Sequence, residues 1–303
     1  MGGLAGVGAP EASMNDLVVL TSQPALPLYE DLRRAAAAAG QPLTVVDATT
    51  AVARAWPPAV WAAGVPVHGA RAVLPRVGNW RPASTLAVLE ALQAAGVASL
   101  NPARAVRVGR DHWRTMQVLA AAGVPCPETI AGSEPDRLVE AALQLGFPCV
   151  VKQRRSRQGV GVIQCGDRAT LAAVLDSLWR VGDEVVVQRF CPPGGVSVRV
   201  LVLQGEVLGA TRHTARPGEF RSNAAQGGAV EAFELREDLA GLALGAATAA
   251  GLGFCGVDLL PDGNRWVVGE INPTPGWTHF TRATGIDVAA RLIAALRRLG
   301  AGE

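Results

Sequence analysis

The first third of the chain alternates short apolar runs with amphipathic stretches. The apolar runs at 16–23, 43–46 and 71–76 predict buried strands, because they are short and rich in Val and Leu. Good helix formers over 28–39 predict a helix, which ends at Gly40 because glycine readily takes the left-handed conformation after a helix. This strand–helix alternation predicts a small parallel α/β domain.

The middle third continues with helices that begin at short polar residues. Asp111 is placed to N-cap a helix that ends at Gly123. Ser84 is placed to N-cap a helix that precedes this one in the sequence. Another helix begins at Asp167 or Ala169. One further helix and three strands are predicted here, at 135–145 and then at 148–152, 161–164 and 184–190.

In the last third the pattern becomes antiparallel. Apolar strands at 196–203 and 207–211 pair across a glycine-containing turn at 204–205. A polar, glycine-rich loop follows at 212–228. Two helices are predicted beyond it, at about 238–250 and 287–299.

The pattern divides the 303 residues into a terminal tail and three folded parts. The first residues lack the basic and long apolar segments of a signal peptide, so we expect a disordered tail. The net charge of +2 gives no reason to expect nucleic-acid binding, and no run of about 18 apolar residues indicates a membrane span. The predicted divisions are a tail at 1–14, an N-terminal α/β domain at 15–108, a central subdomain at 109–190 and a C-terminal subdomain at 191–303.

Five cysteines are scattered along the chain without the spacing of a metal site. Isolated thiols inside apolar runs favour buried free cysteines, which are typical of a reducing compartment. We therefore expect a cytoplasmic protein. The five residues are Cys126, Cys149, Cys165, Cys191 and Cys255.

A second hairpin, with strands at 255–260 and 265–270 joined by the turn formers Pro-Asp-Gly-Asn, carries two carboxylates. Folding about the turn brings Asp258 level with Glu270, and Asn272 shares the side-chain parity of Glu270. Mg²⁺ prefers such hard oxygen ligands. The alternative is a pair of solvated strand-edge charges. The apolar neighbours of Asp258 and the stiff Pro-Thr-Pro-Gly turn favour the metal site.

A basic, glycine-containing loop follows the strand that ends at Lys152. Several arginines there precede Gly159 and Gly161. Glycines let backbone N–H groups approach phosphates closely, and the basic side chains add positive charge. The alternative is a hairpin with a solvated basic tip, because short glycine patterns are weak signals.

Three arginines and one asparagine of the last third suit the same chemistry. Arg199 lies on a predicted strand, and Arg212 and Arg221 lie in the polar loop, with Asn223 on the side of Arg221 if the chain is extended there. Guanidinium groups bind phosphates and carboxylates in a bidentate manner. Each residue alone is typical of a surface. Together with Lys152 and the hairpin carboxylates they predict a triphosphate–metal site.

The order of these segments resembles the ATP-grasp superfamily, and within it the RimK-like amino-acid ligases. The similar segments span residues 74 to 284 and include FPCVVKQRRSRQGVGVI, VVVQRF, FRSNAAQGG, GVDLL and EINPTPGW. Their combination is specific, although no single one is. The resemblance implies an α/β ATP-grasp fold with a parallel N-terminal subdomain, a central ATP-binding subdomain and a C-terminal antiparallel subdomain. It also implies ATP held between the central and C-terminal sheets.

The resemblance also implies roles for individual residues. The implied nucleotide contacts are Lys152 and Gly159 at the phosphates, the backbone of Gln188, Arg189 and Phe190 at the adenine, Ser197 at the ribose and Arg221 at the reacting phosphate. The implied catalytic residues are Arg199, Arg221 and Asn223, and the implied metal ligands are Asp258, Glu270 and Asn272. The cofactors are ATP and two Mg²⁺ or Mn²⁺ ions.

Four positions depart from the pattern of the family. Arg189 stands where the family usually has Glu, which leaves backbone pairing with adenine intact. Ser197 replaces an Asp that usually holds the ribose, and Ser156 replaces a glycine of the phosphate loop. His112 follows Asp111 where the family commonly has Lys, which weakens a phosphate contact.

The resemblance implies an ADP-forming carboxylate–amine ligase that works through an acylphosphate. The implied partners are ATP, an amino acid such as glutamate and a carboxylate acceptor that is a small molecule, a peptide or a protein tail. A non-catalytic nucleotide-binding regulatory protein and a carboxylate phosphotransferase stay open as alternatives, and so does a homo-oligomer. His213 and His279 are interpreted either as surface loop residues or as substrate contacts.

Overall fold

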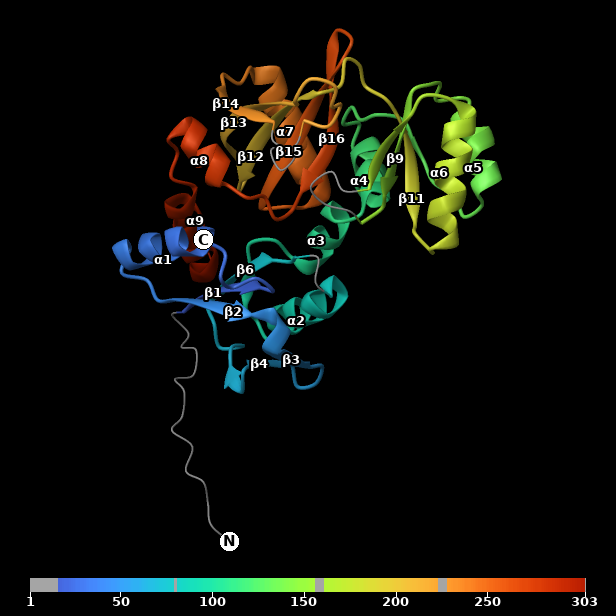
Figure 1. Cartoon of the computed structure of the whole chain (residues 1–303). Coiled ribbons are helices and arrows are strands. Elements are labelled where there is room, and N and C mark those ends of the chain that lie inside the picture. The colour runs from blue at the N-terminus through green and yellow to red at the C-terminus, as the bar shows by residue number, and fades with distance from the viewer. Residues whose placement is uncertain (1–15, 79–80, 156–160, 223–227, 303) are drawn as a thin grey trace. The chain divides into compact units, whose positions relative to one another are not determined.

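The computed structural model describes residues 16–78, 81–155, 161–222 and 228–302 (Figure 1). Its contacts divide the chain into two compact units, one of Met1–Ala103 with Asp287–Glu303 and the other of Arg104–Ile286. Three residues named above, Ser156, Gly159 and Asn223, lie outside the described residues. The finer division into three parts stays a prediction.

The first unit contains a parallel sheet in the order β2-β1-β6-β7. Its strands are β1 (Leu17–Thr21), β2 (Leu43–Asp47), β6 (Ala72–Arg76) and β7 (Ala98–Ser99), and its helices are α1 (Leu28–Ala38), α2 (Pro82–Ala94) and α9 (Val288–Ala301). All residues of β1 and β6 are buried, which explains why these runs are continuously apolar rather than alternating. The predicted parallel α/β arrangement is confirmed.

The stretch between β2 and β6, which lacks a clear sequence pattern, forms a small antiparallel sheet in the order β3-β4-β5. Its elements are η1 (Ala48–Thr50), β3 (Ala51–Arg54), β4 (Ala59–Ala62) and β5 (Val65–Pro66). Strands this short escape pattern analysis, because alternation becomes visible only over longer runs.

The predicted N-cap at Ser84 is wrong. Helix α2 begins two residues earlier, at Pro82, with Arg81 at the N-cap and no side-chain capping hydrogen bond. Proline suits the first helical position, because its missing N–H would have no partner there in any case. Ser84 therefore lies inside the first turn.

After α3 (Ala103–Gly109), the second unit forms an antiparallel sheet in the order β10-β9-β11-β8. The strands are β8 (Thr129–Ile130), β9 (Cys149–Gln153), β10 (Val162–Cys165) and β11 (Val185–Arg189), and the helices are α4 (His112–Ala121), α5 (Pro135–Ala142) and α6 (Arg168–Arg180). Leu138 of α5 and Leu171 of α6 pack with Val151 of β9 in its core.

The predicted N-cap at Asp111 is confirmed in this unit, and the helix expected from Asp167 or Ala169 has Asp167 as its N-cap. The Asp111 carboxylate accepts hydrogen bonds from the backbone N–H groups of Trp113 and Arg114 at the start of α4. Asp167 accepts one from the backbone N–H of Thr170 at the start of α6. Both carboxylates satisfy donors that the helix itself leaves without a partner.

The other sheet of this unit has the order β14-β13-β12-β15-β16. Its strands are β12 (Val196–Leu203), β13 (Glu206–Thr214), β14 (Ala229–Phe233), β15 (Phe254–Asp262) and β16 (Arg265–Asn272), and the helices are α7 (Glu237–Ala250) and α8 (Thr278–Thr284). Ala243 and Ala246 of α7 share a buried core with Val200, Val257 and Val268 of the strands.

The turn between β15 and β16 is shorter than predicted. Pro261 and Asp262 belong to β15, which leaves Gly263-Asn264 as the turn. The pairing of β15 with β12 ends at Leu259, so Pro261 lies where the strand has a neighbour on one side only. Proline is tolerated there, because no ladder partner requires its missing N–H on the open side.

Strand β13 is longer than predicted and extends to Thr214. Arg212 and His213 therefore lie on a strand and not in the polar loop. The guanidinium of Arg212 lies 5.1 Å from the ring centroid of Phe233. His213 is buried, so its interpretation as a surface loop residue is wrong. Burial, and then the charge of Arg199, lower the pKa of His213 to about 4.

Candidate functional site

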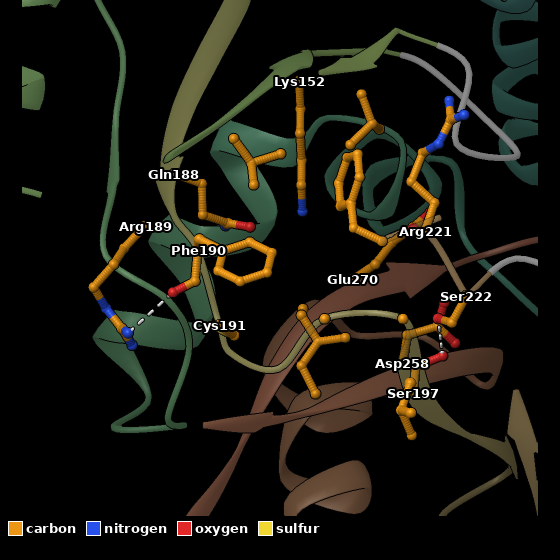
Figure 2. Close-up of a pocket in the computed structure, with 18 of the residues that line it drawn as sticks. Lys152, Gln188, Arg189, Phe190, Cys191, Ser197, Arg221, Ser222, Asp258 and Glu270 are labelled. Atoms are coloured by element: carbon orange, nitrogen blue, oxygen red, sulfur yellow. Dashed lines mark hydrogen bonds between the residues drawn. The ribbon is translucent and has the colours of Figure 1, made fainter. Parts of the chain in front are cut away.

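A pocket of the second unit lies between its two sheets (Figure 2). Eight of the predicted site residues line it: Lys152, Gln188, Arg189, Phe190, Ser197, Arg221, Asp258 and Glu270. Sequence reasoning missed Cys191, Phe220 and Ser222, which line it as well. These three follow or adjoin predicted residues in the chain, and this adjacency is the only signal that the sequence offers for them.

A row of polar side chains crosses the sheet of β12, β13, β15 and β16, and two of its members line the pocket. Arg199 on β12 is paired with Thr211 on one side and with Asp258 on the other, and Asp258 is paired with Glu270. Cross-strand partners project to the same face of a sheet, so these side chains are neighbours. Antiparallel pairing thus brings the two predicted carboxylates together across β15 and β16.

Arg199 binds Asp258 in a bidentate ion pair. Its Nε donates to Oδ1 and its Nη2 to Oδ2, both at 2.6 Å, and Asp258 is only 7% exposed. Burial acts to lower the pKa of Arg199, but the charge and hydrogen bonds of Asp258, with a contribution from Glu270, outweigh it and raise that pKa. The guanidinium is therefore a permanent cation beneath the carboxylates. Arg199 does not line the pocket itself.

Lys152 is the only lysine of the chain. It points from β9 into the pocket, towards the strands that carry Asp258 and Glu270 (Figure 2). Burial lowers its pKa, and the charges of Glu270, Cys191 and Asp258 oppose that shift. All other basic residues of the Lys and Arg type in the sequence are arginines. Lysine at this one position supplies a compact, titratable ammonium group, whereas arginine would supply a wide, planar guanidinium group.

His112 lines the same pocket at the start of α4. Burial, and then the charge of Lys152, lower its pKa to about 3, against the opposing effect of Asp111. The imidazole is therefore neutral near pH 7. His112 stands where the family commonly has lysine. A neutral histidine at this position leaves the pocket with one positive charge fewer and a different shape.

Arg221 is held by a carboxylate two residues earlier. Glu219 accepts from Arg221 Nε at 2.9 Å, from Nη2 at 2.7 Å and from the backbone N–H at 2.9 Å. These hydrogen bonds from Arg221 lower the pKa of Glu219 to about 2. Phe220, between them, meets Phe190 edge to face with ring centroids 6.5 Å apart. The segment that carries Arg221 is therefore tied to the segment after β11.

The segment whose backbone is predicted to contact adenine, Gln188 to Phe190, lies at the end of β11. The side-chain amide of Gln188 is buried and donates to Thr129 Oγ1 at 2.8 Å. Arg189 points away from Lys152 (Figure 2) and forms a bidentate pair with Asp262, at 3.0 and 2.8 Å. The side chains of both residues are thus occupied on the protein side. Their backbone stays next to the pocket.

Ser197, at the position that resembles a ribose contact, is paired with another hydroxyl. Its Oγ lies 2.6 Å from Ser222 Oγ (Figure 2). Ser197 is 5% exposed, so this neutral pair replaces a carboxylate at the edge of the pocket. A hydroxyl donates as well as accepts, which leaves hydrogen-bonding capacity for a ligand but supplies no charge.

The oxygen donors of β15 and β16 fit a hard divalent cation. Asp258 and Glu270 face each other, and Asn272 Oδ1 accepts from the backbone N–H of Thr274 at 2.9 Å, which fixes the amide. Each carboxylate oxygen of Asp258 retains a lone pair beyond its bond to Arg199. Across the described residues, groups of three or more His, Cys, Asp or Glu with metal-binding geometry are absent. An ion held here would need water or phosphate oxygens to complete its shell.

Comparison with known proteins identifies the family. A model of the RimK-like ATP-grasp domain matches residues 109–296, and a model of the RimK pre-ATP-grasp domain matches residues 15–106. The chain belongs to the RimK-like ATP-grasp family. The resemblance inferred from the sequence motifs is thereby confirmed.

Relatives of similar length carry a common name. A protein of Stutzerimonas stutzeri named probable alpha-L-glutamate ligase is 31% identical over 288 residues, which cover 94% of this chain and 96% of the relative. A protein of Thioalkalivibrio sulfidiphilus with the same name is 34% identical over 238 residues, which cover 78% and 79%. The similarity to family members thus extends over nearly the whole chain.

Solved structures confirm the ATP-grasp fold. The RimK domain protein of Sphaerobacter thermophilus has a TM-score of 0.72 and 22% identity, with coverage of 93% of this chain and 99% of that chain. D-cycloserine synthetase DcsG has a TM-score of 0.72 and 21% identity, with coverage of 94% and 99%. In the described part of the chain, no helix has both the length and the apolar character needed to cross a membrane.

Proposed function

We propose that this RimK-like ATP-grasp protein is an ATP- and Mg²⁺-dependent ligase that joins a carboxylate to an amine. The observation that carries the proposal is the pocket itself. It places the half-buried Lys152 together with two adjacent carboxylates, Asp258 and Glu270, and with Arg221. This arrangement suits a triphosphate with its metal, because it combines cationic groups for phosphate oxygens with hard oxygens for a cation.

The proposed reaction has two steps. An oxygen of the acceptor carboxylate attacks the γ-phosphorus of ATP, the bond to the β-phosphate oxygen breaks, and ADP and an acylphosphate form. The amine nitrogen then attacks the acyl carbon, the amide bond forms, and phosphate leaves as the amine loses a proton. Both steps need positioning and charge neutralisation rather than a protein nucleophile.

The residues of the pocket take roles that suit these steps. Lys152 and Arg221 would bind phosphate oxygens, and Asp258 and Glu270, with Asn272 at the end of β16, would hold the metal. The backbone at the end of β11 pairs with adenine. Bound Mg²⁺, as one ion or two, or Mn²⁺ in its place, would neutralise the phosphates as a Lewis acid. Arg199 positions Asp258 through its bidentate pair and supports that role from beneath.

Glutamate is the amino acid that we propose for the amine. The names of the two relatives, probable alpha-L-glutamate ligases, support it. Structural neighbours include the ligase PsnB complexed with its precursor peptide, and PsnB with minimal precursor, Mg and ADP. A peptide or small carboxylate is therefore the acceptor class to test first.

Two other functions predict different products. A carboxylate phosphotransferase would release ADP without any amine, whereas a ligase releases ADP and phosphate only when both substrates are present. A non-catalytic nucleotide-binding protein would bind ATP and release neither. The discriminating experiment measures phosphate release with Mg²⁺ and ATP over a matrix of amino acids and carboxylates, with detection of the amide by mass spectrometry.

We expect Lys152→Ala to weaken ATP binding or to slow phosphoryl transfer by roughly ten- to a hundredfold. One charge-assisted hydrogen bond to phosphate contributes about 1.5–3 kcal/mol, which corresponds to that range. Calorimetric titration with a non-hydrolysable ATP analogue and Mg²⁺ checks the affinity, and single-turnover kinetics checks the rate. Unchanged values for both would exclude the assigned role.

We expect Glu219→Gln to lower kcat by roughly five- to tenfold across pH 5–9, because Arg221 loses a charged partner that fixes its direction. The pKa of Glu219 is depressed to about 2. Its contribution to stability is therefore fully present above the ordinary carboxyl pKa and is lost only as the pH falls through about 2. Kinetics at several pH values checks this.

The exposed carboxylate Glu206, at the start of β13, provides the matched control for this variant. Glu206→Gln makes the same chemical change away from the pocket and should leave kcat unchanged. If Glu219→Gln behaves as Glu206→Gln does, the carboxylate has no part in positioning Arg221.

A further inference from the structure

The first unit has a hollow of its own, of about 280 Å³, at the C-terminal end of α9. Ala294, Arg297, Arg298 and Ala301 line one side of it, and Arg71, just before β6, lines the other. The helical positions recur at intervals of three and four residues, so they form one face of α9. The small side chains of the two alanines leave the hollow open, and the two arginine side chains lie at its edge.

Arg71 is fixed in place by its neighbours. Its backbone N–H donates to Asp16 and its carbonyl accepts from Ala98, so β1 and β7 hold it from both sides. Its side chain lies against Gly300 so closely that a Cβ built at Gly300 would come within 2.4 Å of Arg71 Cγ. A glycine at this helical position therefore permits the approach of the arginine to the end of α9.

The charge of this hollow is not balanced. Three of its five lining residues are arginines, and none is acidic. Within the described ranges, Arg71, Arg297 and Arg298 form no ion pair, whereas Arg33 and Arg34 of α1 pair with Glu30 and Asp31. The helix α9 contains no carboxylate at all. Three like charges around one space repel one another unless an anion lies between them.

The negative end of the α9 dipole explains only part of this arrangement. A cation in the last turn of a helix is favourable, which accounts for Arg298 and in part for Arg297. It does not account for Arg71, which lies just before β6 and whose side chain lies against Gly300. A charge supplied from a separate element, facing two others across an open space, is the arrangement of an anion site.

We propose that this hollow binds a small polyanion with at least two phosphate or carboxylate groups. Guanidinium groups bind both kinds of oxyanion with paired hydrogen bonds. Three separate cations around one open space match a ligand with several negative charges. The site is distinct from the nucleotide pocket, which the second unit forms from its own residues.

Titration of the full chain with tripolyphosphate and, separately, with tetraglutamate tests the site and distinguishes the two sources of oxyanion. Hydrogen exchange locates the binding, because a ligand in the hollow protects the last two turns of α9 and the start of β6, whereas one in the nucleotide pocket protects β9 and β15. We expect protection at α9 that weakens as salt is raised. If neither polyanion protects this region at low salt, the proposal is wrong.

Substitution of the arginines provides a second test of the proposed anion site. Arg71→Gln and Arg298→Gln should each weaken binding at α9 by roughly tenfold, because each removes one charge-assisted contact. Arg291→Gln makes the same change on the same helix at an exposed position outside the hollow and should have no effect. Equal losses in Arg291→Gln and Arg298→Gln would show attraction to net charge only and would overturn the proposal.

Gly300→Ala tests the placement of Arg71 without changing any charge. The added methyl group occupies the space of the Arg71 side chain and displaces the guanidinium, so affinity should fall several-fold. Alanine favours the helical conformation over glycine, so the variant should fold at least as stably as the wild type if the arginine moves aside. Wild-type affinity in this variant would contradict the part assigned to Arg71.

Discussion

Glu270→Gln is expected to reduce turnover by about three orders of magnitude while leaving the fold intact. The carboxylate faces Asp258 across the hairpin, and its replacement removes one of two anionic oxygen donors from the proposed metal position. A bound metal ion stabilises the charge of phosphoryl transfer by several kcal/mol, and about 4 kcal/mol corresponds to a thousandfold in rate. Steady-state kinetics with Mg²⁺ and ATP measures the loss, and circular dichroism verifies the fold.

The matched control for this variant is Glu231→Gln. Glu231 is an exposed carboxylate on β14 of the same sheet, so the chemical change is identical and the distance from the pocket is the difference. It should retain wild-type turnover. A Glu270→Gln enzyme that keeps more than about a tenth of wild-type turnover would rule out Glu270 as an essential metal ligand.

Asp258→Ala is expected to lower the free energy of unfolding by about 3 kcal/mol, in addition to abolishing turnover. Removing one partner of a buried ion pair leaves the other charge without compensation, which costs about 3–5 kcal/mol for a fully buried pair. The lower figure applies here, because the Arg199 side chain keeps 22% of its exposure. Denaturant unfolding of the wild type and the variant measures the difference.

The double variant Asp258→Leu with Arg199→Met separates the ion pair from the packing. With both charges removed and similar volumes retained, no uncompensated charge remains, so most of the lost stability should return. Turnover should not return, since the metal ligand is absent. If the double variant is no more stable than Asp258→Ala, the destabilisation comes from packing and not from the charge of Arg199.

The sequence predicted the centre of the candidate site well. Folding about the turn brought Asp258 near the level of Glu270, but their direct pairing also requires a register shift between Asp258 and Leu259 that alternation does not predict. The N-cap of α4 at Asp111 was predictable, since capping depends on residues within one turn. Local signals thus predict a helix start and the approximate level of two side chains in a hairpin, whereas a bulge in the hairpin sets the exact register.

Contacts between distant segments were not predictable from that periodicity. Arg189 and Asp262 lie 73 positions apart, and Asp262 was interpreted as a turn residue before the structure paired it with the arginine. Ser197 and Ser222 are also joined only by folding. Such pairs depend on which sheet edges meet, a property of tertiary packing that neither propensity nor alternation encodes.

The extent of β13 shows a third limit. Residues 212–214 are polar and lead into a glycine-rich loop, so composition suggests that the strand has ended. Pairing with both β12 and β14 nevertheless continues to Thr214 and buries His213. Backbone pairing with two neighbouring strands thus extends the strand although the composition of these residues is polar.

The lone lysine has a practical consequence. Among the side chains of this sequence, reagents that acylate lysine amines have one target, Lys152, in the pocket proposed to bind the nucleotide. Coupling a dye or a surface through amines therefore risks blocking the pocket itself. The same property makes the degree of acylation at Lys152 a direct reading of pocket occupancy, because a bound nucleotide shields the amine and no other lysine contributes to the signal.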